Sequence, residues 1–317
     1  MTGPFAAGDP AAERRWSAPF AVDVPGILSV HRRGPGDPAF ITDEAGAIWR
    51  ACRTPDGPGT IRITAVRGSP GGAATDVRAA AWGPGAGWLL GALPGWLGAD
   101  DRPDEFVPAH PVLRAAARKH PEFRIGRTGL VLEALVPAVL EQKVVGREAV
   151  RAWRILLRRY GEPAPGPAPA GLRVPLSPAA WAAIPSWEWH RAGVEAVRAR
   201  TIAAAARVAP RLEEIVALSP EQADRRLRSL PGIGPWTSAE VRQRACGDPD
   251  AVSVGDYHLP AIVGWALAGR VVDDAEMLDL LAPYAGQRHR ASMLAALSGT
   301  RPPRRGPHLS VRDYRSI

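Results

Sequence analysis

The chain has 317 residues, a length that predicts two domains or one large domain. Glycine and proline contribute 33 residues each, above their average usage, but 46% of the residues are hydrophobic, as in folded proteins. Disorder throughout the chain is therefore excluded. Basic residues outnumber acidic ones by 40 to 32, which gives a formal net charge of +8, and only Lys119 and Lys143 are lysines. Such a cationic excess is typical of proteins that bind nucleic acid.

Several classes of protein are disfavoured by what the chain lacks. Two cysteines, Cys52 and Cys246, are too few for a four-cysteine zinc site or an iron–sulfur cluster, and we expect both to be reduced. No apolar run approaches 18 residues, and residues 1–10 lack an apolar signal region. We therefore expect a cytoplasmic protein with no membrane segment.

The N-terminal part of the chain predicts a β domain. Residues 1–15 are small and polar, and we expect a disordered arm there. Over residues 16–98 the hydrophobic pattern has the period of two that is typical of strands, and a short helix is expected at 88–93. The pattern predicts three to five antiparallel strands, among them 40–42 and 48–51 around a turn, and 60–65.

Beyond residue 108 the hydrophobic period becomes helical, and residues 99–300 are expected to form a helical domain that a basic tail, 301–317, follows. Ser219 is a strong start signal, because Pro220 can take the first helical position and Gln222 can close a capping box. That helix should end at Leu230. Other helices are expected at 130–140, 147–160, 178–184 and 193–208.

The most informative segment is a glycine-containing turn between two helices, Leu230 to Ala239. Gly232 and Gly234 can adopt positive φ and allow the backbone to approach a ligand closely. Their N–H groups and the following helix N-terminus form an anion site, while Ile233 should anchor the hairpin in the core. Such a device binds a phosphate without reading a base sequence. An ordinary turn between helices is the structural alternative.

This segment resembles the hairpin of the helix-hairpin-helix DNA glycosylase superfamily, and within it the chain is most similar to AlkA-type 3-methyladenine DNA glycosylases. Leu135 to Gln142 resembles the family's helix that ends in a glutamine near DNA. Two further stretches, 247–251 and 254–257, resemble the segment that carries its catalytic aspartate. Four matched blocks occur in the correct order. The resemblance implies an α+β fold, in which an N-terminal antiparallel β domain precedes an all-helical helix-hairpin-helix glycosylase domain.

The resemblance assigns the catalytic carboxylate to Asp256. The chemistry agrees, because cleavage of an N-glycosidic bond develops positive charge on the sugar and a fixed carboxylate stabilises it. A helix N-cap is the alternative role, and the two roles are compatible. Bifunctional relatives carry a Schiff-base lysine where this chain has Trp236, and neither lysine is near the motif in sequence. We therefore expect a monofunctional hydrolase that uses no metal or organic cofactor.

The resemblance also implies two groups of binding residues. DNA binding falls to Gly232, Ile233, Gly234, Thr237, Gln142 and Lys143, and the base pocket to Trp236, Glu240, Tyr257 and Tyr284. Core packing is the alternative for the tryptophan and the tyrosines.

Two of these residues depart from the family pattern. Glu240 replaces a pocket tyrosine, so it could attract a cationic base, act as a second acid–base group or point elsewhere. Lys143 stands where the AlkA type can carry an apolar wedge. His258 has no role in the family, and we expect it to be structural.

The sequence as a whole predicts a monomeric DNA glycosylase that releases alkylated purines, 3-methyladenine-like bases, from double-stranded DNA in base excision repair. The alternatives are a glycosylase for another lesion, such as a deaminated purine or uracil, and a lesion-binding protein without catalysis. A helical protein with no role on DNA is the last alternative.

Overall fold

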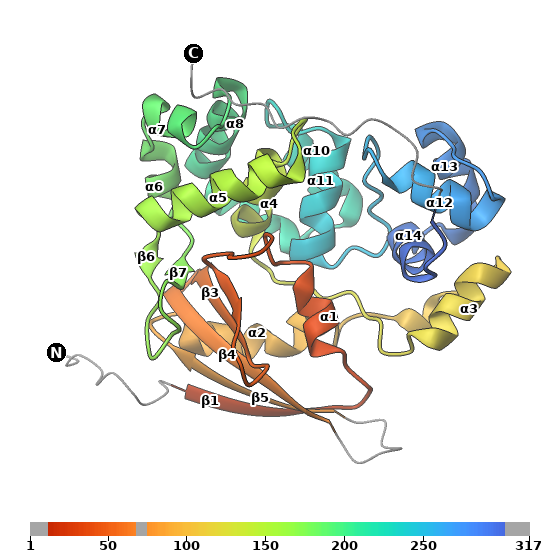
Figure 1. Ribbon diagram of the computed structural model, residues 1–317, viewed down its shortest axis with the longest axis horizontal. Helices are drawn as coiled ribbons and strands as arrows, with labels where there is room; N and C mark the ends of the chain where they lie inside the picture. Colours follow the sequence, from red (N-terminus) through yellow and green to blue (C-terminus); the bar gives the residue numbers. More distant parts are fainter. Residues whose placement is uncertain (1–11, 68–74, 302–317) are drawn as a thin grey trace.

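The computed structural model describes residues 12–67 and 75–301. Its N-terminal part is a five-stranded antiparallel sheet with the strand order β1-β5-β4-β3-β2, drawn at the lower left of Figure 1. The strands are β1 (Ala12–Ala18), β2 (Phe40–Thr42), β3 (Ile48–Thr54), β4 (Gly57–Arg67) and β5 (Thr75–Trp82). The prediction of three to five antiparallel strands is confirmed.

Two helices accompany the sheet. α2 (Ala86–Trp96) confirms the helix expected at 88–93 and buries Leu89, Leu93 and Trp96 against the inner face of β4 and β5. α1 (Val24–Ser29) was not predicted; the Asp23 carboxylate caps it by accepting from Gly26 N at 3.1 Å.

The disordered arm expected at 1–15 is wrong for residues 12–15, which belong to β1 and pair with β5. Hydrogen bonding to β5 and the partial burial of alternate side chains outweigh the polar composition there. The rest of that arm, residues 1–11, and most of the expected basic tail, residues 302–317, lie outside the described residues.

The remainder of the chain is mainly helical, as predicted. Within the described ranges no helix is long and apolar enough to cross a membrane. Four short helical turns, η1 (Pro103–Glu105), η2 (Glu214–Ala217), η3 (Arg242–Cys246) and η4 (Ala282–Tyr284), connect the longer elements. The α-helices are α3 (Pro111–Lys119), α4 (Val131–Leu140), α5 (Gly146–Tyr160), α6 (Pro178–Ala183), α7 (Ser186–Arg191), α8 (Ala196–Arg207), α9 (Ala209–Glu213), α10 (Pro220–Arg228), α11 (Pro235–Val241), α12 (Leu259–Ala268), α13 (Asp274–Leu281) and α14 (Arg288–Leu297).

This second part is not all-helical, which corrects the prediction. β6 (Glu162–Pro163) pairs with β7 (Arg173–Val174), and the segment packs on the outer face of the sheet. There Val174 joins Trp49 and Trp82, whose rings stack with centroids 5.4 Å apart. The apolar outer face of β3 and β5 needs a cover, and this hairpin supplies it.

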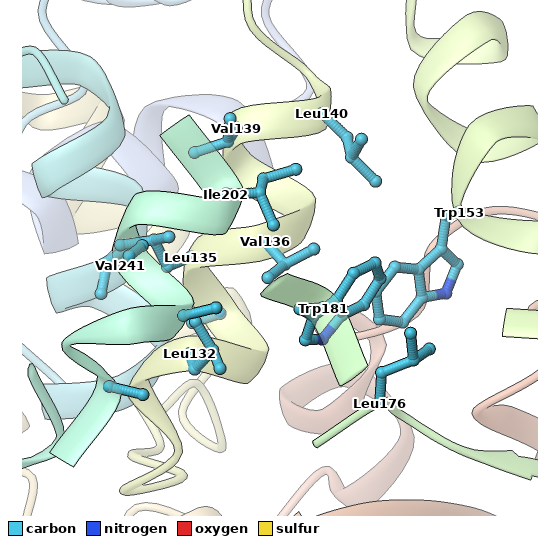
Figure 2. Packing of buried hydrophobic residues seen from close by; sticks show 14 of the residues in the cluster. Leu132, Leu135, Val136, Val139, Leu140, Trp153, Leu176, Trp181, Ile202 and Val241 are labelled. Atoms are coloured by element: carbon cyan, nitrogen blue, oxygen red, sulfur yellow. The ribbon is translucent and has the colours of Figure 1, made fainter. Parts of the chain in front are cut away.

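The main core is built around α4, whose Leu135, Val136 and Val139 lie among Trp181, Ile202 and Val241 (Figure 2). Its residues are apolar on nearly every side, so the helix is buried among α5, α8, α9 and α11. Pro137 sits inside it, and the backbone of its first turn is bound by Glu213, whose carboxylate accepts from Val131 N and Leu132 N at 2.8 and 2.9 Å.

The sheet and the helical part are joined by buried polar contacts. Arg50 on β3 donates to Glu133 on α4 at 2.7 Å, and its guanidinium lies over the Trp96 ring at 4.6 Å. The backbone before α4 crosses to η3, where Thr128 N donates to Arg244 O at 2.9 Å. Arg244 Nε also donates to Val30 O at 3.3 Å, so the position of η3 is fixed from both halves of the chain.

Candidate active site

The hairpin between α10 and α11 combines one glycine of positive φ with one extended, unobstructed glycine. The predicted capping box at Ser219 is present, although α10 ends at Arg228 rather than Leu230. Gly232 has φ of +87°, and a Cβ on it would lie 2.2 Å from Oγ1 of Thr201, so only glycine fits. Gly234 is extended, with φ of −94°, and faces open space. Ile233 is 5% exposed and packs in the main core, as expected.

Gln142 fastens the loop after α4 to this hairpin. Its Nε2 donates to Gly232 O at 2.9 Å and to Thr237 Oγ1 at 2.8 Å. The side chain of Thr237 is only 2% exposed, so it positions Gln142 rather than presenting itself to DNA.

The next residue, Lys143, is exposed and has a positive φ of +55°. No other non-glycine residue in the described part of the chain has a positive φ. A positive φ at a non-glycine residue costs free energy, so it persists only where contacts with the surrounding structure hold it in place. Lys143 is far from the hairpin in sequence, but its neighbour Gln142 touches the hairpin, so Lys143 lies beside it in space.

Asp256 is held at the start of α12. Its Oδ1 accepts from His258 N and Leu259 N, both at 2.8 Å, so the carboxylate caps the helix. Its Oδ2 lies 3.4 Å from Nε1 of Trp236, and both side chains are partly exposed. Capping uses one oxygen of Asp256 and leaves the other directed toward the indole.

The loop that carries Asp256 runs antiparallel along one face of α11 and η3. Asp256 meets Trp236 at one end of this face. Ser253 Oγ then donates to Glu240 Oε1 at 2.6 Å, and Gln243 Nε2 donates to Ala251 O at 2.8 Å and to Ser253 Oγ at 2.9 Å. These bonds fix the orientation of the loop relative to α11.

Glu240 is buried and fully engaged. Oε2 pairs with Arg244 Nη1 at 2.6 Å, and Oε1 accepts from Ser253. Burial would raise the pKa of Glu240, but the Arg244 guanidinium and the Ser253 hydroxyl hold it below its ordinary value. Of the three roles left open for Glu240, the structure matches the last: the carboxylate points elsewhere, toward Arg244 and Ser253.

The two tyrosines proposed for the pocket have different surroundings. Tyr257 is 77% exposed beside Asp256, with its ring edge against His258. Tyr284 is 3% exposed, stacks on Phe106 and engages His110 through its hydroxyl. Tyr284 thus packs in the core of the C-terminal helices, which corrects its assignment to the base pocket.

A cavity of about 300 Å³ lies between α1, residues 120–126, η3 and α14. Apolar side chains, among them Ile27, Phe123 and Met293, line part of it, and polar residues line the rest: Asp23, Ser29, His120, Glu122, Arg124, Gln243, Arg244 and His289. Burial lowers the pKa of His289 to about 4; Glu240 opposes this shift, while Arg244 and Arg290 add to it.

The polar residues of this cavity were not predicted from the sequence. The spacing of four from Glu240 to Arg244 could have indicated one of them, because it places both on one helix face. Nothing in the sequence around His289 indicates that α14 faces η3.

No protein-family model matches the chain. A curated relative from Mycobacterium tuberculosis, described as a probable bifunctional transcriptional activator/DNA repair enzyme AlkA, is 35% identical over 159 residues. The match covers 49% of this chain and 31% of the relative, so the chain matches about a third of that relative's length.

Solved structures match almost the whole chain. A 3-methyladenine DNA glycosylase from Archaeoglobus fulgidus gives a TM-score of 0.69 at 18% identity, over 90% of this chain and 97% of its own. The apo-form of an 8-oxoguanine glycosylase/lyase from Clostridium acetobutylicum gives 0.67 at 11% identity, over 92% and 100%.

The fold is that of these solved DNA glycosylase structures. Over about half of its length the chain is also similar to the relative described as AlkA, in line with the resemblance drawn from the sequence.

Proposed function

We propose that this protein is a DNA N-glycosylase that acts on damaged duplex DNA in base excision repair. The observation that carries the proposal is Asp256, a carboxylate fixed at the N-terminus of α12 with one oxygen turned to Trp236. It follows a phosphate-binding hairpin along the same helix face. The similarity to AlkA supports the same conclusion.

In the proposed reaction the hairpin binds backbone phosphate through N–H groups near Gly232 and Gly234. The nucleotide is turned out of the duplex, and Asp256 Oδ2 stabilises the positive charge that develops on the sugar as the base leaves. Water then adds to the sugar and leaves an abasic site. The backbone bonds to Oδ1 keep the carboxylate in place throughout, so little reorganisation is needed.

We propose that the reaction is monofunctional. Trp236 occupies the position where bifunctional relatives carry a lysine, so α11 provides no amine to attack the sugar. Lys143, on the loop beside the hairpin, is the lysine that a test of this proposal must include.

Alkylated purines are the first candidate substrates, because the similarities to AlkA and to a 3-methyladenine DNA glycosylase support them. Neutral deaminated or oxidised bases are the second candidate. The observation that favours the second class is Glu240, which stands where the family pattern has a pocket tyrosine and is bound by Arg244 and Ser253.

The test is release of bases from duplex DNA by wild type and Asp256→Asn. We expect wild type to release at least one class of damaged base and the variant to bind the same DNA without releasing it. Equal release by both proteins would show that Asp256 takes no part in the reaction. Binding without release by wild type on every lesion would favour the lesion-binding alternative.

A further inference from the structure

The loop that carries Asp256 is held to α11 at two points. Nε1 of Trp236 lies 3.4 Å from Oδ2 of Asp256, and Glu240, four residues further along the helix, binds Ser253. Four residues advance an α-helix by about 6 Å, so the two points are separated by about that distance along the axis. Between them, Asp256 N donates to Ser253 O at 3.1 Å. Ser253 is the last buried residue of the loop before the carboxylate.

The hydrogen bonds of Ser253 have one consistent direction. Ala251 O can only accept, so the group that Gln243 turns toward it at 2.8 Å is the amide NH2. The same nitrogen lies 2.9 Å from Ser253 Oγ, which therefore accepts from it. The hydroxyl proton is left for Glu240 Oε1, at 2.6 Å. Ser253 thus needs an acceptor on α11, and an ionised carboxylate is one that cannot donate.

Arg244 keeps Glu240 in place and in its ionised form. Its Nη1 pairs with Glu240 Oε2 at 2.6 Å and also donates to Glu240 O at 3.0 Å. Burial favours the neutral acid, yet the Arg244 guanidinium and the Ser253 hydroxyl keep the pKa of Glu240 below its ordinary value. Arg244 is itself fixed by Val30 O, which accepts from Nε at 3.3 Å. One continuous set of bonds therefore leads from Val30 to Asp256.

We propose that Glu240 is a positioning residue, which acts through Ser253 to set the place of the Asp256 carboxylate relative to the sugar. In this role Glu240 touches no reacting atom. A displacement of about 1 Å at a reacting group can lower a rate by about 100-fold, so an anchor one hydrogen bond away from Asp256 has a large effect. The inference rests on the proposed N-glycosylase activity and adds a residue that this activity requires.

The first test is single-turnover release from a duplex with a lesion that wild type releases. Ser253→Ala removes the hydroxyl and leaves every charge in place. We expect its rate at saturating protein to fall by about 10-fold to 100-fold, while its affinity for the duplex stays within about 2-fold of wild type. A rate within about 2-fold of wild type would overturn the inference.

The same change is then made in the Asp256→Asn background, because a positioning residue matters only while the group that it positions is present. Ser253→Ala should alter the residual rate of Asp256→Asn by less than about 2-fold. An equal fold-loss in both backgrounds would show that Ser253 acts independently of Asp256, against the inference.

Ser238→Ala is the matched control. Ser238 is also buried, and its Oγ also donates to a carboxylate at 2.6 Å, Oδ1 of Asp224 on α10. The variant loses the same kind of bond without a link to Asp256. Its melting temperature should fall about as much as that of Ser253→Ala, while its rate at saturation stays that of wild type. Equal losses of rate in the two variants would assign the effect to stability and overturn the inference.

The contribution of Glu240 itself is tested with Glu240→Leu, Arg244→Met, a double variant that leaves no buried charge of this pair without its partner. We expect the double variant to reproduce the loss seen in Ser253→Ala. Adding Ser253→Ala to it should lower the rate no further, because the bond is already absent. Additive losses would overturn the link from Glu240 to Ser253. If the double variant does not fold, the Ser253→Ala measurements decide the inference.

Amide hydrogen exchange separates this inference from the proposed activity, because it needs no base release. The amide of Asp256 is bonded to Ser253 O, so in the DNA-free protein it should exchange about 10-fold faster in Ser253→Ala and unchanged in Ser238→Ala. Unchanged exchange in Ser253→Ala would count against the positioning role. Absence of base release on every lesion, or a wild-type rate in Asp256→Asn, would instead count against the N-glycosylase proposal.

Discussion

The indole nitrogen of Trp236 lies 3.4 Å from Oδ2 of Asp256, while Oδ1 of the same carboxylate caps α12. The two oxygens therefore have separate tasks. One accepts from the backbone, and the other accepts from the indole N–H and is, in the proposed reaction, the oxygen that faces the sugar. A carboxylate with this arrangement is already oriented before DNA binds, which is what electrostatic stabilisation of a developing cation requires.

Asp256→Asn should lower the rate of base release by about 100-fold or more, because the variant loses the negative charge near the sugar. The amide oxygen of asparagine still caps α12, so the melting temperature should change little. Asp273→Asn is the matched control, since Asp273 caps α13 through Glu276 N at 2.9 Å. Similar losses of activity in both variants would show that the cap, rather than the charge, matters.

The two hairpin glycines should respond differently to alanine. Gly232→Ala forces a side chain into positive φ and against Thr201, so we expect a loss of stability of about 1–3 kcal/mol and a loss of DNA binding. Gly234→Ala meets no atom within 4 Å and should fold as wild type. If a phosphate approaches the backbone there, the added methyl group weakens DNA binding. Thermal melts and salt-dependent binding measure both effects, and unchanged binding by Gly234→Ala would contradict the close approach.

Borohydride trapping on DNA with a lesion that wild type releases tests the monofunctional assignment. We expect no covalent complex and no strand cleavage without alkali, because α11 carries Trp236 in place of an amine. Lys143→Ala accompanies wild type, since Lys143 lies beside the hairpin. A trapped complex that disappears in Lys143→Ala would contradict the prediction and identify the amine.

Stability should fall as the pH is lowered from about 6.5 to 4. The pKa of His289 is about 4 in the folded protein and that of His31 is also lowered, chiefly by burial. In this window the unfolded chain binds protons that the folded protein does not, so the free energy of unfolding decreases with decreasing pH. The loss from His289 is on the order of 3 kcal/mol once complete. Chemical unfolding at several pH values measures the slope, which His289→Gln should reduce. The exposed His190→Gln is the control, and equal slopes in all three proteins would refute the assignment.

Much of the hairpin could be predicted from the sequence because its chemistry is local. A capping box, two glycines and a proline at a helix start are readable from neighbouring residues, and Ile233 packs as expected. The position of Asp256 after the hairpin could also be predicted, since spacing along the chain sets it.

The cavity could not be predicted, because distant segments form it. α1 has only six residues and contains Pro25 and Gly26, so it gives no helical period, yet it supplies one wall. Arg244 could equally have faced solvent; its orientation follows from Glu240 and from the carbonyl of Val30, 214 positions earlier. The same reason explains the error at Tyr284, whose partner His110 is 174 positions away.

The bond from Arg244 to Val30 ties η3 to the residue that follows α1, so both halves of the chain build the cavity jointly. A chimera that moves residues 220–260 into a relative would carry over the hairpin and Asp256 but leave one wall of the cavity behind. During divergence, changes in α1, which lies between β1 and β2, and changes in η3 would have to compensate each other to keep this wall intact.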